Sequence, residues 1–274
     1  MTSRNRRVLP GFGLTLGYTV FVLSALVVVP LAACCGKAAT LTFDEFWSAA
    51  WNDRARAAYL LTVEVSLAAA ALNVVLGLLV AWVLARYEFP LKRLFDALVD
   101  LPFALPTSVA GLVYASLYVK DGWLGQWLVP LGIEAAYTPL AIVLVLTFIG
   151  LPFIVRTVQP VLESIDVEVE EAAAALGATR WQTFRRVLLP TLYPAILTGF
   201  ALAFARALGE YGSVVFVSGN MPFKTEIAPV LIVARLEEFA YAEATAIAVV
   251  LLALSLSMLI VINSLERWSK RYDA

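Results

Sequence analysis

An arginine and a glutamate stand four residues apart inside a long apolar run, at Arg206 and Glu210. A guanidinium presents several N–H donors, so an arginine within a membrane is a candidate for binding an oxyanion. The spacing also lets both side chains meet on one helical face and neutralise each other. Both interpretations stay open, and mutual neutralisation is the simpler one.

The other reactive residue types exclude several kinds of site. Glu64 and Asp100 lie near the ends of apolar runs, where contact with interfacial water is the ordinary explanation. The chain has no histidine, which excludes histidine-based triads, metal sites and proton switches. Cys34 and Cys35 are adjacent and predict no disulfide framework. We expect no catalytic residue and no metal site.

The chain also lacks a loop for nucleotide phosphates. Its only Gly-Lys pair, Gly36 and Lys37, follows Leu31 where the G-x-x-x-x-G-K-[ST] pattern requires glycine. A formal net charge of −1 gives no basic excess for nucleic acid. Any ATP and Mg²⁺ used by this protein must therefore bind to another chain.

Membrane helices are the elements that must position these residues, because 61% of the 274 residues are apolar and the mean hydropathy is +0.84. A helix needs about 20 apolar residues to cross a hydrocarbon core of about 30 Å. We therefore predict an all-α membrane protein with six transmembrane helices, over residues 11–33, 60–85, 98–119, 138–155, 191–218 and 242–264.

Positive charge predicts how the chain is oriented. Most of the 20 Lys and Arg residues fall at the two ends of the chain and in the connections around residues 86–93 and 156–186. The positive-inside rule then places both termini in the cytoplasm.

The first apolar run permits a second interpretation. Leu-Ala-Ala-Cys ending at Cys34 looks like a lipoprotein signal with an acylated cysteine. The run is longer than a typical signal, and further spans follow, so a retained span is the simpler account. Residues 40–59 then suit either a short interfacial helix, with Trp47 and Trp51 on one face, or a solvated loop.

The longest cytoplasmic connection, within residues 160–190, predicts two short helices joined by a sharp turn. Asp166 is a candidate N-cap, and acidic residues follow it in the first turn, where the helix dipole favours them. Four alanines, Ala172–Ala175, continue the helix and leave room for close contact with a partner. An ordinary linker helix is the alternative.

The second half of this connection carries its own start and stop signals. Gly177 stands where a left-handed C-terminal cap is needed. Thr179 and Gln182 form a capping-box pattern that opens a second helix, which we expect Pro190 to end.

The stretch EEAAAALGATRWQTFRRVLLP, residues 170–190, resembles the signature of ATP-binding-cassette importer permeases. That signature is E-A-A, three residues, Gly, nine residues, Ile, one residue and Leu-Pro, and Val187 replaces the isoleucine. The resemblance implies a type I (MetI-like) importer fold, in which this loop is a coupling helix seated in a cleft of a separate ATPase subunit. It assigns ATPase coupling to Glu171, Ala172, Ala173, Gly177, Ala178, Thr179, Arg180 and Pro190.

Four further stretches look like the T-type permeases of sulfate/thiosulfate importers, at residues 6–17, 96–112, 152–163 and 206–229. The resemblance implies import of sulfate or thiosulfate. Residues 206–212, RALGEYG, also look like molybdate permeases, so molybdate, tungstate or another oxyanion is the alternative substrate.

Prolines predict a break in the third span. Pro102 and Pro106 interrupt it, which suits either a flexible gate or a static packing feature. With Arg206 and Glu210 these prolines are our candidate pathway residues. The outer segment 219–229 suits either a contact with a substrate-delivery protein or a plain reverse turn.

The complete machine implied by the resemblance has several chains. It adds two ATPase subunits, a second permease and a periplasmic binding protein, in a bacterial inner membrane. We expect the second permease to be a homologue rather than a copy of this chain. We divide this chain into residues 1–58, with the first span and interfacial segment, a transmembrane domain at 59–264 and a tail at 265–274. An ion-coupled secondary transporter is the distant alternative, but we see no inverted repeat of broken spans.

Overall fold

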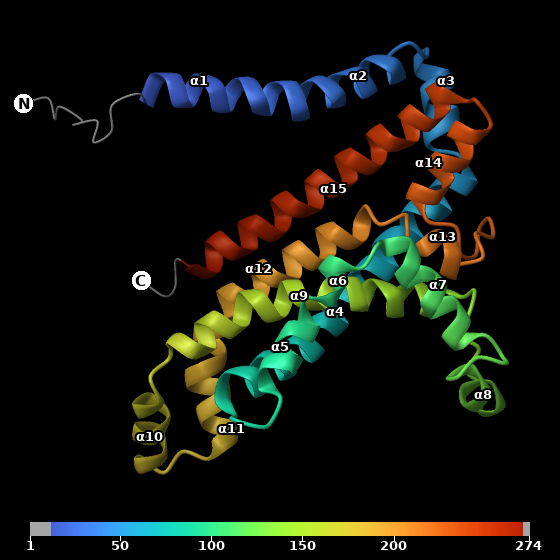
Figure 1. Cartoon of the computed structure of the whole chain (residues 1–274). Helices are drawn as coiled ribbons and strands as arrows, with labels where there is room; N and C mark the ends of the chain where they lie inside the picture. The colour runs from blue at the N-terminus through green and yellow to red at the C-terminus, as the bar shows by residue number, and fades with distance from the viewer. Residues whose placement is uncertain (1–11, 271–274) are drawn as a thin grey trace, which may run out of the picture.

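The structure, a computed structural model, describes residues 12–270, with side chains as far as Ser264. Every regular element in this range is a helix, which confirms the predicted all-α class. Four long helices lie side by side in Figure 1: α4 (Asp53–Arg86), α9 (Pro139–Ser164), α12 (Leu189–Leu208) and α15 (Tyr241–Lys270).

The bundle has two distinct ends. The start of α1 (Phe12–Leu23) and the end of α15 lie at the same end as α10 (Val167–Ala175) and α11 (Arg180–Thr183). We call this the α10 end. At the opposite end, the α3 end, lie α3 (Phe43–Ala50), α13 (Val214–Val217) and α14 (Ala228–Glu237).

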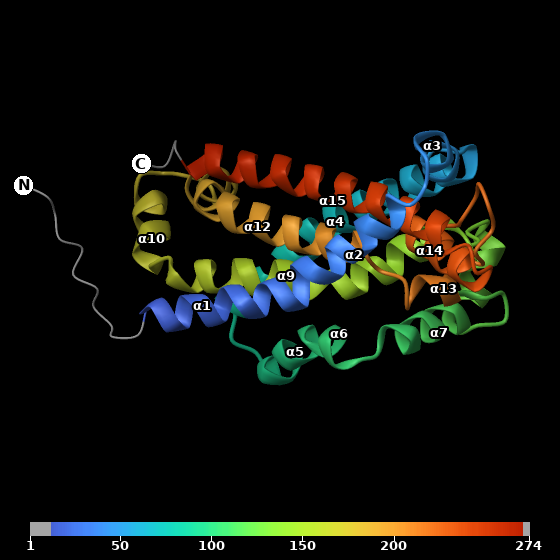
Figure 2. The ribbon, with the colours of Figure 1, turned by 90° about the horizontal axis from the view of Figure 1, so that it is seen from above.

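Five helical stretches within the described residues are long and apolar enough to cross a membrane, beginning at residues 12, 53, 139, 180 and 241. The predicted third span, 98–119, is not among them. It is split into α5 (Lys92–Val99), α6 (Leu101–Ala104) and α7 (Thr107–Tyr118), which together run along the bundle (Figure 2).

Proline accounts for the sharpest break in this third crossing. Pro106 disfavours a helical backbone at the residue before it, and Leu105 is extended, with φ −81° and ψ 131°. The break that the sequence predicted in this crossing is therefore confirmed, and the crossing begins at Lys92, six residues before the predicted start. Two short turns, α8 (Gly125–Leu128) and η2 (Val129–Leu131), follow α7 before α9.

The predicted fifth span is also wrong at both ends. A continuous helical stretch begins at Arg180, and α12 ends at Leu208, so residues 209–213 form a turn rather than a helix. Pro190 does not end the helix that precedes it. A π-helical turn, η3 (Phe184–Leu188), widens the backbone just before this proline and so accommodates its ring and missing N–H.

The same arrangement occurs in the first span. The π-helical turn η1 (Ser24–Val28) joins α1 to α2 (Val29–Ala38), and Pro30 follows it by two residues. The helix continues through Cys34 and Cys35, which are free thiols. No residue of α1 is buried within the chain.

Glycines bring α4, α9 and α12 together at the centre of the bundle. A Cβ atom added to Gly77 of α4 would lie 2.6 Å from the Ile154 side chain of α9. A Cβ added to Gly199 of α12 would lie 2.4 Å from Thr157 Oγ1, also on α9. These contacts are the close helix approach that small residues permit in membranes.

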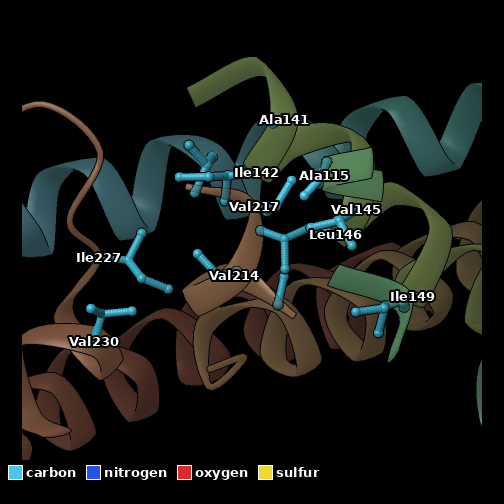
Figure 3. Packing of buried hydrophobic residues seen from close by; sticks show 14 residues of the cluster. Ala115, Ala141, Ile142, Val145, Leu146, Ile149, Val214, Val217, Ile227 and Val230 are labelled. Carbon is cyan, nitrogen blue, oxygen red and sulfur yellow. The ribbon is translucent and has the colours of Figure 1, made fainter. Parts of the chain in front are cut away.

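Apolar packing fixes the α3 end onto this core. Figure 3 shows Leu146 and its neighbours on α9 facing Val214 and Val217 of α13, with Ile227 and Val230 beside them. All of these side chains are buried. The core therefore holds the α12–α13 turn and the start of α14 in a fixed place.

The segment between the first two spans contains a short helix, which is one of the two interpretations that the sequence permitted. Thr42 and Glu45 form a capping box that opens α3, and Asn52 caps α4. The rings of Trp47 and Trp51 meet edge to face, with centroids 5.8 Å apart, as their spacing of four predicted.

Candidate functional site

The α10–α11 turn is built by local sequence chemistry. Gly177 has φ +82°, which confirms the predicted left-handed cap. The Gly177 N–H donates to the Ala174 carbonyl (2.9 Å), and the Ala178 N–H donates to the Ala173 carbonyl (3.0 Å). These two bonds form a Schellman motif that closes the end of α10.

The start of α11 is capped as the sequence predicted. The Gln182 N–H donates to Thr179 Oγ1 (3.3 Å), and the Thr179 N–H donates to Gln182 Oε1 (2.8 Å). Asp166 occupies the N-cap position of α10, but its side chain makes no capping hydrogen bond. The turn between the two helices therefore has a fixed geometry.

This turn presents an apolar, exposed surface. Leu176 is 90% exposed and Trp181 is 66% exposed. Glu171 and Ala172 are exposed on α10. A pocket of about 360 Å³ lies between the two helices and is lined by Ala173, Leu176, Gly177, Ala178, Gln182, Thr183, Arg186 and Val187.

Two residues of α4, Arg86 and Trp82, tie this turn to the bundle, and neither was predicted from the sequence. Arg86, in the last turn of α4, forms an ion pair with Glu170 of α10 (2.7 Å) and donates to the Ile165 carbonyl (3.3 Å). Trp82 meets Phe184 edge to face, with ring centroids 5.8 Å apart. Both contacts join residues far apart in sequence, so no local pattern could have revealed them.

The candidate pathway residues lie in a second region. Arg206 is in the last turn of α12, not at the middle of a span, and Glu210 lies beyond the helix end. The predicted ion pair between them is present. The Glu210 side chain is 3% exposed, and it also accepts the Ser213 N–H (2.9 Å) and Ser213 Oγ–H (3.0 Å).

Glu210 is thus fully occupied, whereas Arg206 is more open. The Arg206 side chain is 36% exposed, and in the described part of the chain Glu210 is the one residue that its guanidinium contacts by a hydrogen bond or ion pair. The guanidinium therefore keeps N–H groups that can donate hydrogen bonds to an anion. The arrangement supports both earlier interpretations: the pair neutralises itself and leaves donors free.

The break before α7 lies against this turn. A Cβ on Gly212 would lie 2.3 Å from Thr107 Oγ1, and a Cβ on Gly111 would lie 2.2 Å from the Ser213 carbonyl oxygen. Pro106 is the N-cap residue of α7, so its break is in direct contact with the turn that holds Glu210. Pro102 lies in α6, farther along the crossing.

Asp100 and Glu64 differ in their surroundings. Glu64 is exposed on α4. Asp100 is bound by Arg156 of α9 at 2.7 Å, so interfacial exposure is only part of its environment. The outer segment 219–229 folds as a reverse turn in which three N–H groups, of Lys224, Thr225 and Glu226, donate to the Met221 carbonyl.

Comparison with known proteins gives a family that fits this geometry. A sequence model of the family described as "Binding-protein-dependent transport system inner membrane component" matches residues 73–271. "Sulfate transport system permease protein CysT" of Escherichia coli (strain K12) is 48% identical, over 97% of each chain. "Probable sulfate transport system permease protein cysT" of Nephroselmis olivacea is 50% identical, over 99% of this chain and 94% of that protein.

Solved structures with a similar fold are also transporters. A chain of the bacterial ABC transporter involved in the import of the acidic polysaccharide alginate superposes with a TM-score of 0.73 and 19% identity, over 92% of this chain and 93% of that one. A chain of the MetNI methionine ABC transporter gives 0.54 and 21%, over 77% and 93%. At these identities the likeness shows the fold alone.

Proposed function

The chain belongs to the family of binding-protein-dependent transport system inner membrane components, and from this premise we propose that it is the permease subunit of an ATP-driven importer of sulfate or thiosulfate. As a multi-pass ATP-binding-cassette permease, it moves substrate rather than transforming it. The observation that carries the proposal is the exposed, doubly capped α10–α11 turn, together with relatives near 50% identity that are named sulfate permeases.

The α10–α11 turn would transmit force from the ATPase. Leu176 and Trp181 give it an apolar contact surface, and Glu171 and Arg180 add exposed charge beside it. A displacement of α10 reaches α4 through the Arg86–Glu170 ion pair and through Trp82 and Phe184. Hydrolysis of Mg-ATP belongs to the partner subunit in this account.

The remaining partners would cover the other exposed surfaces. The exposed faces of α1 suit lipid or a second permease, for which we favour a homologous chain. The α3 end, with Met221 and Phe223 exposed on its loop, would receive a periplasmic sulfate-binding protein. The host membrane would be a bacterial inner membrane. The transmembrane domain would comprise residues 59–264, between an N-terminal part at 1–58 and a tail at 265–274.

Substrate would pass the turn that holds Arg206. Its free N–H groups attract a tetrahedral anion, while Glu210 offsets its charge and keeps the anion from binding too tightly. Pro102 and Pro106 would let the third crossing move as the two openings alternate.

The test is uptake of labelled sulfate into proteoliposomes that contain the whole complex and internal ATP. We expect ATP-dependent uptake that excess unlabelled thiosulfate inhibits and molybdate inhibits weakly. Inhibition by molybdate at lower concentrations than thiosulfate would assign the complex to molybdate. Arg206→Ala should lower uptake by roughly tenfold if the arginine meets the anion, and unchanged uptake would make Arg206 structural.

Coupling is tested by charge reversal on α10. Glu171→Arg should abolish co-purification with the ATPase, because it reverses a charge within the contact surface. Glu168→Arg, on the first turn of the same exposed helix, is the matched control and should retain the ATPase. A permease that transports without any ATPase would overturn the proposal and favour a secondary transporter.

A further inference from the structure

Arg156 on α9 donates hydrogen bonds to Asp96 of α5, to Asp100 just after α5, and to Gln159 of its own helix. Its Nε and Nη2 donate to the two carboxylate oxygens of Asp100, at 2.8 and 2.7 Å. Its Nη1 donates to Asp96 Oδ1 (2.6 Å) and Gln159 Oε1 (3.1 Å), and its Nη2 also donates to the Asp96 carbonyl (2.8 Å). These five bonds use all five N–H donors of the guanidinium. Arg156 therefore holds this segment in place and has no N–H left to donate to an anion.

The segment that Arg156 fastens has a bend at each end. We call residues 92–104, which comprise α5 and α6, the α5–α6 panel. Before it, Leu91 has φ +65°, a left-handed backbone that is costly for a residue with a Cβ. After it, Leu105 is extended in front of Pro106. The panel is therefore a short rigid piece between two non-helical joints.

Apolar packing holds this panel only weakly. Val99 is its one buried residue, and a pocket of about 460 Å³ separates α5 from α4 and α9. The pocket is lined by Leu79, Val80, Val83, Leu84, Phe89, Phe95, Leu98, Val99 and Leu151. Such a gap forfeits the van der Waals contacts that fix packed helices. Besides the polar bonds, Phe103 of the panel meets Phe153 of α9, with ring centroids 5.3 Å apart.

The ion pairs of Arg156 with Asp96 and Asp100 can also break. The side chains of Asp96 and Asp100 are 41% and 47% exposed, and that of Arg156 is 33% exposed. All three groups would be hydrated on separation, so release leaves no buried charge without a partner. A more deeply buried triad would be too costly to break during each cycle.

We infer that Arg156 is a positioning residue for transport, which holds the α5–α6 panel against α9 in one state of the cycle and releases it in another. This inference rests on the proposed function, because the panel is part of the crossing that carries Pro102 and Pro106. The panel's position would set how far the α10 end of the pathway opens.

The panel's position is measured directly with spin labels on Leu94→Cys and Ser164→Cys, in a background where Cys34 and Cys35 are serine. Leu94 and Ser164 are exposed on α5 and α9 respectively. In the resting permease without ATP, we expect a narrow distance distribution for the parent and a broad one for Arg156→Gln, because the five bonds are lost. The charge-swapped pair Arg156→Asp with Asp100→Arg should narrow the distribution again. A distribution that stays narrow in Arg156→Gln overturns the inference.

Transport by the whole complex supplies the second readout. Arg156→Gln should lower sulfate uptake by roughly tenfold and uncouple it from ATP hydrolysis, and the charge-swapped pair should recover most of the loss. Arg56→Gln, which removes an exposed arginine from an i,i+3 ion pair on α4, is the control and should change neither readout. Full uptake with normal coupling in Arg156→Gln would also overturn the inference.

If Arg156→Gln does not accumulate in the membrane, Asp96→Asn and Asp100→Asn each remove one carboxylate charge and carry the same distance measurement. The distances are taken on the permease whatever it transports, so a parent complex that takes up no sulfate refutes the proposed substrate and leaves the panel measurement standing.

Discussion

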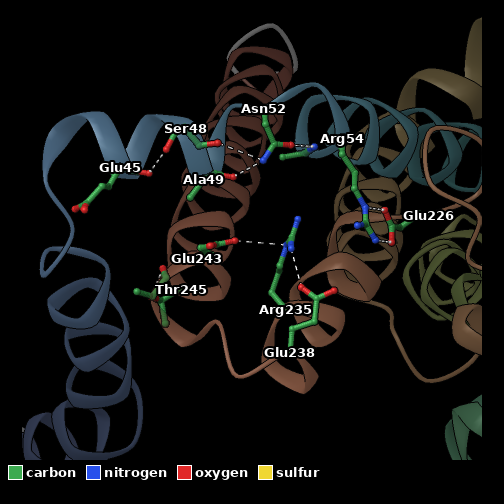
Figure 4. Close-up of polar contacts among 12 residues, drawn as sticks. Glu45, Ser48, Ala49, Asn52, Arg54, Glu226, Arg235, Glu238, Glu243 and Thr245 are labelled. Carbon is green, nitrogen blue, oxygen red and sulfur yellow. Dashed lines mark hydrogen bonds and ion pairs between the residues drawn. The ribbon is translucent and has the colours of Figure 1, made fainter.

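At the scale of single residues, Glu226 at the α3 end carries a buried charge that needs a partner of opposite charge. The Arg54 Nε and Nη2 each lie 2.7 Å from an oxygen of the Glu226 carboxylate, whose side chain is 3% exposed (Figure 4). Close by, the Ala228 N–H donates to Thr62 Oγ1 at 2.8 Å. These bonds anchor the loop before α14 to the start of α4.

Removing Arg54 should therefore destabilise the protein. Arg54→Ala leaves a buried carboxylate without its charged partner, and we expect the free energy of unfolding in detergent to fall by about 3 kcal/mol. Arg56→Ala is the matched control. Its ion pair with Asp53 has side chains 53% and 81% exposed, so its loss should change stability by less than about 0.5 kcal/mol. Equal losses in the two variants would contradict this account.

At the scale of elements, the turn after α12 depends on a close backbone approach. A Cβ at Gly111 of α7 would lie 2.2 Å from the Ser213 carbonyl oxygen and 2.8 Å from the Ser213 Cα, both backbone atoms that cannot swing aside. Ser213 in turn donates two hydrogen bonds to Glu210. The packing of α7 and the arrangement of the ion pair are thus linked.

Gly111→Ala should push α7 away from this turn. We expect a lower thermal midpoint in detergent, equivalent to about 1–3 kcal/mol of overpacking, and reduced uptake because Glu210 shifts. Gly36→Ala, in α2, meets no atom within 4 Å and is the control. It should be neutral or slightly stabilising, since alanine favours a helix over glycine. A Gly111→Ala protein as stable as the control would show that α7 and the turn can separate freely.

How well sequence predicted these elements depended on the range of the interactions. The α10–α11 turn was predicted nearly residue by residue, because Gly177, Thr179 and Gln182 act within their own turns. The Pro190 prediction failed since a π-helical turn relieved the proline's clash without ending the helix. The bonds of Arg156 join residues 56 and 60 apart, and no local pattern indicates such pairs.

For the whole molecule, the arrangement of ends makes a prediction about sidedness. The α10–α11 turn and the loop at residues 219–229 lie at opposite ends of the bundle (Figure 1). Leu176 is 90% exposed on the first and Phe223 is 65% exposed on the second. The positive-inside rule places the first in the cytoplasm and the second outside it.

Single cysteines at these two positions test that placement. In a background with Cys34 and Cys35 replaced by serine, a membrane-impermeant maleimide added to intact spheroplasts should label a Phe223→Cys protein. It should label a Leu176→Cys protein only after the membrane is permeabilised. Labelling of Leu176→Cys in sealed spheroplasts would place the turn out of reach of any ATPase and refute the proposed coupling.

The length of α4 has a mechanical consequence. This helix of 34 residues is about 50 Å long, is held by Arg54 and Thr62 near its first turns, and is gripped by Glu170 through Arg86 in its last turn. A helix held near one end and pushed at the other swings about the held end, and α9, which packs closely on Gly77 of α4, must move with it. A stroke applied at Arg86 would swing the middle of the helix, near Ala70, by about half as much and leave Arg54 almost still. The α3 end of the bundle can thus stay fixed while the α10 end of α4 moves.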